Sequence, residues 1–425
     1  MINGMEGGHE KLLDSCDTPL RACAAKIDFE LDQGTSLSII RLIDSLIEYA
    51  YIARASDVHI DPTKENIQIR IRVDGMLEDA FMLSLSLHAE VISRVKIMCG
   101  LRTDEHQAAQ DGRFNQMLQS GENIDVRVSI VPLYYGENAV LRLLVDTKKL
   151  FNLTKLGFSL PNQEKIQAAL KRPHGMILAT GPTGSGKTTT LYTLINVINS
   201  KHTSIVTIED PIEYAIAGIN QIQVNARSGL MFGNGLRSIL RQDPNIIMVG
   251  EIRDHETAGL AVNTALTGHL VLSTLHTNDA ATTLPRLLDM GVESYLIAST
   301  VSVAIGQRLL RRLCDNCKIE RTLLLSEINN LQSFLPTTVN LCERTIWSSV
   351  GCAVCNGSGY KGRVGVHEVL VMTPRLRESV LLRESASVLH QRAIEDGMSS
   401  FFDDTFSKVL LGQTTLEEMI KMKYE

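Results

Sequence analysis

The chain has 425 residues, of which 44% are hydrophobic and 21% are charged, and its formal net charge is −6. This balance is typical of globular proteins and allows about two or three domains, each with its own core. The negative charge argues against a protein that coats nucleic acid, because that function requires an extended basic surface, so no nucleic-acid partner is expected.

Residues 1–35 show no clear hydrophobic period, and we expect a poorly ordered N-terminal arm there, without the apolar core of a secretory signal. From residue 36, apolar residues at helical spacing after a serine predict a helix. Alternating stretches then predict a strand pair, and a second helix precedes further alternation. We interpret residues 36–150 as one α+β domain with a mixed sheet.

Residues 151–312 follow a different pattern, in which helical segments separate four short apolar runs: GMILATG, SIVTIED, NIIMVGE and HLVLSTLHT. Such runs are typical of a buried parallel sheet with crossover helices. The longest apolar stretch, at 294–306, is too short to span a membrane, so we predict a buried helix and no transmembrane segment. Residues 313–360 carry paired cysteines, and residues 361–425 are expected to form a helical region.

The stretch GPTGSGKTTT matches the phosphate-loop pattern G-x-x-x-x-G-K-[ST]. It follows an apolar run and precedes a helix-like segment, which is the context that the motif requires and which argues against a chance glycine-rich turn. Lys187 would reach the β- and γ-phosphate oxygens, and the Thr188 hydroxyl would bind Mg²⁺. The predicted nucleotide-binding residues are Gly181, Pro182, Thr183, Gly184, Ser185, Gly186, Lys187, Thr188 and Thr189.

Acidic residues follow two of the apolar runs. Glu251 is expected to polarise water or to hold Mg²⁺ through water, and the alternative is a solvated acid at a strand end. Glu209, Asp210 and Glu213 follow another run, and together they predict a cluster that organises water and Mg²⁺. Within that cluster Asp210, which precedes a proline, is best explained as a helix cap.

A histidine and an arginine complete the candidates of this region. His276 follows an apolar run at the sheet edge where such folds bind ligands, so we predict a γ-phosphate sensor, with a structural histidine as the alternative. Arg237 and Arg241 share a helix face because they are four residues apart. Arg241 is predicted to face phosphate, and the alternative is a solvated arginine pair.

The residues Cys314, Cys317, Cys352 and Cys355 form two C-x-x-C pairs, a spacing that fits tetrahedral Zn²⁺. Four buried thiols without metal are the alternative. A redox role is disfavoured because neither pair lies beside a thioredoxin-like strand and helix. The module lacks interleaved aromatic residues and a strongly basic neighbourhood, so we expect a structural or docking role for it.

Four motifs now stand in order: GPTGSGKTTT, TIEDPIEY, RQDPNIIMVGEIRD and TGHLVLSTLHTNDA. They resemble the Walker A, Asp, Walker B and His boxes of the ATPases that power type II secretion and type IV pilus machines. The segments ASDVHIDP, RIRVDGML, QDGRF, VRVS and GENAVLRLL resemble the amino-side sheet domain of that family. The cysteine pairs resemble its assembly branch, the GspE/PilB type.

This resemblance implies an α/β fold with a RecA-like P-loop ATPase core, an N-terminal α+β (PAS-like) sheet domain and a small zinc-binding C-terminal insert. It implies a homo-hexamer with ATP, Mg²⁺ and Zn²⁺ as cofactors. By motif, Glu251 is the Walker B glutamate, Glu213 the candidate base and His276 the sensor. Arginines of the sheet domain would reach the phosphates, although each is equally well explained as a surface residue; the matching ones are Arg70, Arg72, Arg94 and Arg113.

Two departures from the family concern Arg113 and the N-terminus. The segment before Arg113 lacks a basic pair and a proline that many relatives carry, and residues 1–35 are too short to replace the separate domain through which many relatives bind their membrane partner.

The leading hypothesis is a cytoplasmic motor ATPase, peripheral at the inner membrane, that drives pilus or pseudopilus assembly through a platform protein. A nucleic-acid translocase ring is the alternative, which the acidic charge disfavours. A nucleotide-dependent switch is a third hypothesis, which the several acidic candidates disfavour.

Overall fold

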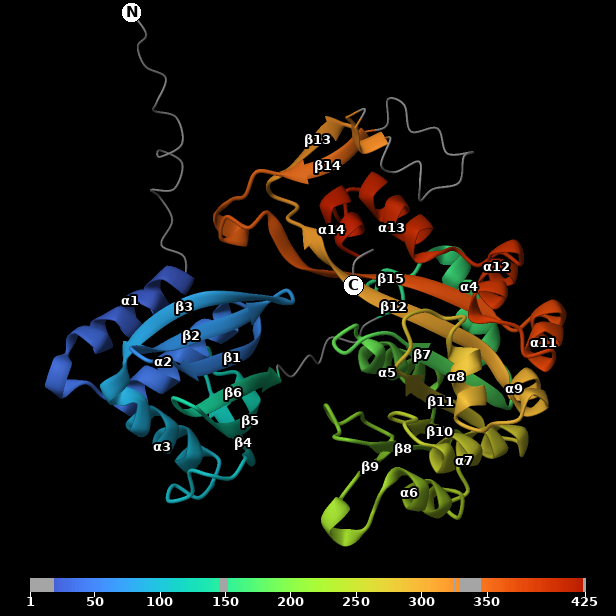
Figure 1. Ribbon diagram of the computed structural model, residues 1–425, viewed down its shortest axis with the longest axis horizontal. Coiled ribbons are helices and arrows are strands. Elements are labelled where there is room, and N and C mark those ends of the chain that lie inside the picture. The colour runs from blue at the N-terminus through green and yellow to red at the C-terminus, as the bar shows by residue number, and fades with distance from the viewer. Residues whose placement is uncertain (1–18, 145–151, 325, 329–344, 423–425) are drawn as a thin grey trace, which may run out of the picture. The chain divides into compact units, whose positions relative to one another are not determined.

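The computed structural model describes residues 19–144, 152–324, 326–328 and 345–422 (Figure 1). The chain divides into two compact units, one of Met1–Lys148 with Gly351–Ser358 and one of Lys149–Val350 with Gly359–Glu425. Among the helices of the described ranges, none is both long enough and apolar enough to cross a membrane. The predicted division of 313–425 into a zinc module and a helical region is finer than these units.

The first unit is a six-stranded sheet in the order β3-β2-β1-β6-β5-β4, covered on one face by helices. Its strands are β1 (Ala55–Pro62), β2 (Asn66–Val73), β3 (Met76–Ser84), β4 (Gln110–Met117), β5 (Asn123–Leu133) and β6 (Gly136–Leu144). The helices are α1 (Pro19–Asp32), α2 (Ile39–Ile52) and α3 (His88–Met98), with the 3₁₀ turns η1 (Gly34–Ser36) and η2 (Leu85–Leu87). Every strand pairing in this sheet is antiparallel, so the predicted mixed sheet is wrong. Short turns join most neighbouring strands, and such turns leave no room for the crossover that a parallel pair needs.

The helical layer begins earlier than the sequence pattern predicted. Residues 19–32 form α1, which buries Cys23, Ile27 and Glu30, so the prediction of a poorly ordered arm is wrong for these residues. The signal is weak because one of these inward positions is a glutamate, which Arg41 of α2 neutralises at 2.8 Å. Residues 1–18 lie outside the described residues. The helix predicted from residue 36 is α2, whose N-cap Ser38 accepts the Arg41 N–H.

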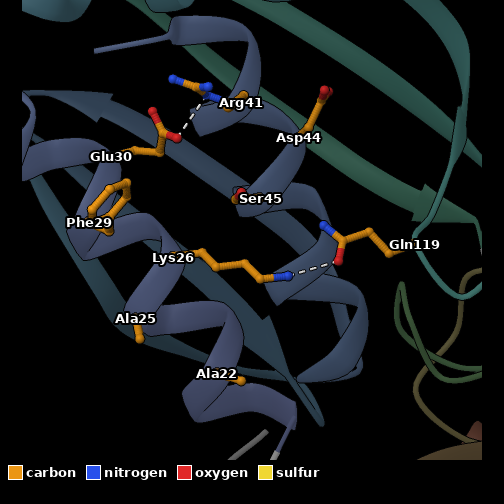
Figure 2. A pocket seen from close by; sticks show the side chains of 9 residues that line it. All are labelled: Ala22, Ala25, Lys26, Phe29, Glu30, Arg41, Asp44, Ser45 and Gln119. Carbon is orange, nitrogen blue, oxygen red and sulfur yellow. Dashed lines mark hydrogen bonds and ion pairs between the residues drawn. The ribbon is translucent and has the colours of Figure 1, made fainter. Parts of the chain in front are cut away.

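A pocket of about 470 Å³ lies beside α1 and α2 of the first unit. Figure 2 shows two contacts among its lining residues: Glu30 pairs with Arg41, and the Lys26 ammonium donates to Gln119 at 2.8 Å. The remaining lining residues are Ala22, Ala25, Phe29, Asp44 and Ser45, and none of the predicted site residues lines it. We therefore assign no function to this pocket.

The second unit is a seven-stranded sheet in the order β15-β12-β7-β11-β10-β8-β9. Its strands are β7 (Gly175–Thr180), β8 (Ile205–Glu209), β9 (Asn220–Gln223), β10 (Ile246–Val249), β11 (Leu270–Leu275), β12 (Val301–Leu313) and β15 (Tyr360–Val371). The four apolar runs became β7, β8, β10 and β11, which pair in parallel as predicted. The helices up to β12 are α4 (Leu160–Leu170), α5 (Lys187–Ile198), α6 (Phe232–Ile239), α7 (His255–Leu266), α8 (Thr283–Asp289) and α9 (Ser294–Thr300), with η3 (Ala226–Ser228) before α6.

Hydrophobic cores fill both faces of this sheet. One core packs α4 and α5 against Ile177 and Leu272, and the other packs α6, α7 and α9 against Leu178 and Val271. Neighbouring residues of a strand point to opposite faces, so each lies in one of the two cores. The strands are therefore continuous apolar runs in the sequence.

Strands β12 and β15 form a long antiparallel pair that runs along one edge of the sheet (Figure 1). Two predictions fail here: residues 294–306 are helical only to Thr300 before β12 begins, and residues 361–371 of the predicted helical region belong to β15. Both stretches are rich in β-branched residues, and pairing with distant strands decides their structure. The remaining elements are η4 (Ala353–Cys355), β13 (Lys318–Thr322), β14 (Thr345–Ser349), α11 (Pro374–Leu381), α12 (Ala386–Glu395), α13 (Phe401–Leu410) and α14 (Leu416–Lys421).

The first unit contains a buried ion pair whose loss should be measurable. Lys96 of α3 is fully buried, and its Nζ lies 2.7 Å from Glu137 Oε1 and donates to the Glu105 carbonyl at 2.5 Å. We expect Glu137→Ala to destabilise this unit by about 3 kcal/mol, because it leaves a buried ammonium without its carboxylate. Hydrogen exchange of the β5 and β6 amides measures the free energy of opening. The exposed Glu65→Ala should change it by less than about 0.5 kcal/mol, and equal effects of the two variants would contradict the assignment.

Candidate nucleotide site

The phosphate-loop motif connects β7 to α5, so the loop backbone lies at a helix N-terminus, where N–H groups favour an anion. Gly181 has φ +144, and a Cβ there would lie 2.2 Å from the Gln307 carbonyl oxygen, so only glycine fits. All nine predicted nucleotide-binding residues belong to this loop and the first turn of α5. Their assignment to nucleotide contacts stays a prediction, which this geometry supports.

Lys187 is buried within the loop, where its Nζ donates to the Gly181 carbonyl at 2.8 Å and to the Pro182 carbonyl at 3.0 Å. Burial lowers the pKa of the ammonium, and the Glu251 carboxylate opposes that shift. The Ser185 Oγ is buried and has no hydrogen-bond partner among the described residues. A buried ammonium, an unpartnered hydroxyl and a helix N-terminus form a donor set that fits the phosphates of a nucleotide.

Gln307 of β12 forms hydrogen bonds with the phosphate loop and with α5. The sequence analysis did not predict this residue. It is 2% exposed. Its Nε2 donates to the Ser185 carbonyl at 2.7 Å, and its Oε1 accepts from the Thr190 hydroxyl at 2.6 Å. The available signal was an uncharged polar residue within the apolar run VSVAIGQRLL, which is far from the motif in sequence.

Glu251 and His276 are brought together because β10 and β11 are adjacent parallel strands whose carboxyl ends meet at one edge. Glu251 Oε2 lies 3.2 Å from His276 Nε2 and 2.6 Å from Arg253 Nε. The glutamate is 8% exposed. Arg253 was not predicted, although it is two residues from Glu251 in sequence. A buried carboxylate between an arginine and a histidine is suited to orienting a water molecule or a hydrated cation.

The predicted cluster of three carboxylates does not form as expected. Glu209 is 2% exposed and accepts from the Tyr192 hydroxyl, from Thr207 Oγ1 at 2.5 Å and from Gln221 Nε2 at 3.1 Å. Its oxygens are therefore used inside the protein. Asp210 is exposed, and no helix follows it, so the prediction of a helix cap is wrong. The Glu213 N–H donates to the Tyr192 hydroxyl at 3.4 Å, and its role as the base stays a prediction.

Arg237 lies in the last turn of α6, and Arg241 follows the end of that helix. Arg237 pairs with Glu256 at 2.5 Å, and the Arg241 guanidinium donates to the Arg237 carbonyl at 3.0 Å and to Ser238 Oγ at 3.1 Å. These contacts favour the alternative of an exposed pair, and the contact of Arg241 with phosphate stays a prediction.

The predicted arginines of the first unit lie on two sides of its sheet. Arg94 belongs to α3 in the helical layer, and its Nε is buried without a hydrogen bond among the described residues. Arg70 pairs with Asp61 at 2.7 Å on the opposite face. Strand register places the following residues in one row across β2, β1, β6, β5 and β4: Arg72, Asp57, Arg142, Arg127 and Arg113. Arg127 and Arg142 were not predicted, although their alternation with buried residues was visible in the sequence.

The four predicted zinc ligands come together, with one Sγ from each of Cys314, Cys317, Cys352 and Cys355 and all four within 4.8 Å of one another. The Sγ atoms of Cys352 and Cys355 are 3.7 Å apart. Zinc–sulfur bonds of about 2.3 Å in a tetrahedron require sulfur atoms about 3.8 Å apart, so this geometry fits a structural zinc ion.

Comparison with known proteins gives consistent matches over most of the chain. The sequence model of the family described as Type II/IV secretion system protein matches residues 32–421. Type II secretion system protein E of Aeromonas hydrophila is 42% identical over 395 residues, which cover 93% of this chain and 77% of that protein. Type IV pilus assembly ATPase PilB of Myxococcus xanthus is 43% identical over 385 residues, which cover 90% of this chain and 67% of that protein. The crystal structure of the pilus retraction motor PilT with bound ADP matches with a TM-score of 0.60 at 26% identity, covering 89% of this chain and 96% of that one.

The position of Gln307 predicts a specific defect. We expect Gln307→Leu to weaken ATP binding about tenfold, because the Ser185 carbonyl and the Thr190 hydroxyl lose a buried partner. Isothermal titration calorimetry with ATP and Mg²⁺ measures the Kd. The same substitution at the exposed Gln391 of α12 serves as the control and should leave the Kd unchanged. Wild-type affinity in Gln307→Leu would show that the loop does not depend on this contact.

The cysteine cluster predicts bound zinc that depends on each thiolate. After dialysis against buffer without metal, elemental analysis of the wild type should find zinc equimolar with the chain. Cys352→Ser should retain less than about a tenth of it, because three thiolates do not complete the tetrahedral site. Cys99→Ser changes a cysteine outside the cluster and should keep the metal. Equal zinc content in both variants would argue against the site.

Proposed function

Because the chain belongs to the Type II/IV secretion system protein family and is an ATPase, we propose that it drives the assembly of a type IV pilus or of a type II secretion pseudopilus. The observation that carries this proposal is the joint placement of the phosphate loop and the Glu251–His276 pair at one end of the parallel sheet. Relatives named for the two machines match at 42% and 43% identity, so the proposal includes both.

The chemistry is in-line attack of water on the γ-phosphate of ATP. Lys187 and the loop N–H groups stabilise the charge that develops on the phosphate oxygens. Glu251, held by Arg253, orients the water, and His276 reports the state of the phosphate through its contact with Glu251. Mg²⁺, held through the Thr188 hydroxyl, would neutralise phosphate charge when bound. Glu213 is the alternative base.

The proposed assembly is a homo-hexameric ring in the cytoplasm, peripheral to the inner membrane through a platform protein. Arg70, Arg72, Arg94 and Arg113 remain our candidates for phosphate contacts in that ring. The zinc module is proposed as a structural or docking element, because its four thiolates close one small site.

Steady-state phosphate release tests this proposal with wild-type protein, zinc-loaded, alone and with the cytoplasmic domain of the platform protein encoded beside it. We expect the platform domain to stimulate turnover and DNA to leave it unchanged. Lys187→Ala should lower kcat by about 100-fold or more, since it removes a charge that stabilises the transition state. Lys201→Ala, at an exposed lysine of the same unit, is the matched control and should behave as wild type.

Two outcomes would contradict the proposal. Strong stimulation by single- or double-stranded DNA, without a response to the platform domain, would indicate a nucleic-acid translocase. A single phosphate released per site without further turnover would indicate a nucleotide-dependent switch.

A further inference from the structure

A buried carboxylate outside the predicted site joins three segments of the second unit. Glu368 of β15 is 2% exposed. Its Oε2 accepts the Ala280 N–H at 3.2 Å, and its Oε1 accepts the Phe401 N–H at 3.2 Å. His390 Nε2 of α12 lies 3.1 Å from Oε1, and this hydrogen bond raises the pKa of the histidine, while burial opposes the shift. Such a set of donors compensates the cost of burying the charge.

The loop that this carboxylate holds begins with His276. Residues 276–282, here called the His276 loop, follow β11 and lead into α8. Their first anchor is Thr180, whose hydroxyl donates to the Thr277 carbonyl at 3.0 Å and accepts the Thr277 N–H at 3.0 Å. Their second anchor is the bond from Ala280 to Glu368. Between them Asp279 accepts from the Thr282 N–H at 2.7 Å, so the loop is fixed along its length.

Strand register explains how Glu368 reaches this loop. The pairings place one row across β11, β7, β12 and β15, made of Leu275, Thr180, Gly306 and Glu368. The His276 loop passes over Gly306, where an added Cβ would lie 3.0 Å from Ala280 N and 3.3 Å from Glu368 Oε2. The glycine therefore leaves the space in which the amide of the loop meets the carboxylate.

The other two donors belong to the C-terminal helices. Phe401 is the first residue of α13, and His390 lies on α12. Next to Glu368, the His367 N–H donates to Asp404 Oδ2 at 2.8 Å, which fixes α13 to the same stretch of β15. A shift of α12 or α13 thus acts on the carboxylate that also holds the His276 loop.

We propose that Glu368 is a positioning residue for ATP hydrolysis, which keeps the His276 loop in the geometry that places His276 against Glu251 and links that geometry to α12 and α13. This inference rests on the proposed role of His276 in hydrolysis. The phosphate loop is held separately by Gln307, so nucleotide binding and the position of His276 depend on different contacts.

Glu368→Gln is the sharpest test because it keeps the shape of the side chain and removes one acceptor. A single amide oxygen does not serve both the Ala280 and the Phe401 N–H groups, since the amide nitrogen is itself a donor. We expect kcat to fall about tenfold and the Kd for ATP with Mg²⁺ to change less than about twofold. Glu395→Gln removes a charge from exposed α12 surface and should retain wild-type kcat.

A double-mutant cycle separates positioning from general loss of stability. His276→Ala alone should lower kcat, and adding Glu368→Gln to it should lower kcat by less than about a further twofold, because the residue acts through the same loop. Multiplicative effects of the two substitutions would overturn our inference. If His276→Ala leaves kcat unchanged, the proposed role of His276 fails, which is a different result from multiplicative effects.

His390 provides a second measurement that does not alter the carboxylate. His390→Gln keeps an N–H donor for Glu368 and should retain wild-type kcat, whereas His390→Ala should lower kcat about threefold with an unchanged Kd for ATP. Should Glu368→Gln fail to fold, judged by circular dichroism, the His390 pair still tests the link. Equal kcat in His390→Ala, His390→Gln and wild type would overturn the connection to α12.

Discussion

The parallel pairing of β7, β11 and β10 is the constraint on which the site depends. Parallel strands in register end at the same edge, so Thr180, Leu275 and Val249 deliver the phosphate loop, His276 and Glu251 to one place. The phosphate loop is more than sixty positions from both Glu251 and His276 in sequence, yet the strand pairing places all three at one edge of the sheet. Side-chain contacts then fix the final geometry, such as the 3.2 Å contact between His276 and Glu251.

The parts of this arrangement that the sequence could predict are those written in local patterns. Apolar runs identified the parallel strands, and the flanks of the phosphate loop identified its context. Cysteine spacing predicted the four-thiol cluster. Gln307 and Glu368 were not predicted because each is a polar residue within a largely apolar buried strand, and its partners lie on segments remote in sequence. Only strand pairing reveals which backbone groups such residues satisfy.

The failed predictions have related physical causes. Glu209 and Asp210 are adjacent, yet one is buried among three donors and the other is exposed, a difference that a count of carboxylates does not capture. Residues 294–306 contain both helix and strand because β12 gains a neighbour on each side, β7 and β15. The N-terminal residues 19–32 form α1 although the helix buries a glutamate, since Arg41 on α2 supplies its counter-charge.

Because side chains alternate between the two faces of the sheet along β12 and β15, these strands contact both the phosphate loop and the His276 loop. Adjacent strand residues point to opposite faces, so Gln307 and Gly306 serve different sides of one sheet. Gln307 meets the phosphate loop on the face of α5, where its register partner His367 stacks on Phe158 with ring centroids 3.6 Å apart. Gly306 and its partner Glu368 meet the His276 loop on the other face. Helices α12 and α13 form hydrogen bonds with residues 367 and 368 of β15. A displacement of these helices would therefore reach the His276 loop through the buried side chain of Glu368. The phosphate loop, in contrast, is held by Gln307 of β12. Separate contacts thus hold the His276 loop and the phosphate loop, and under the proposed role of His276 this would allow ATP hydrolysis to be controlled independently of ATP binding.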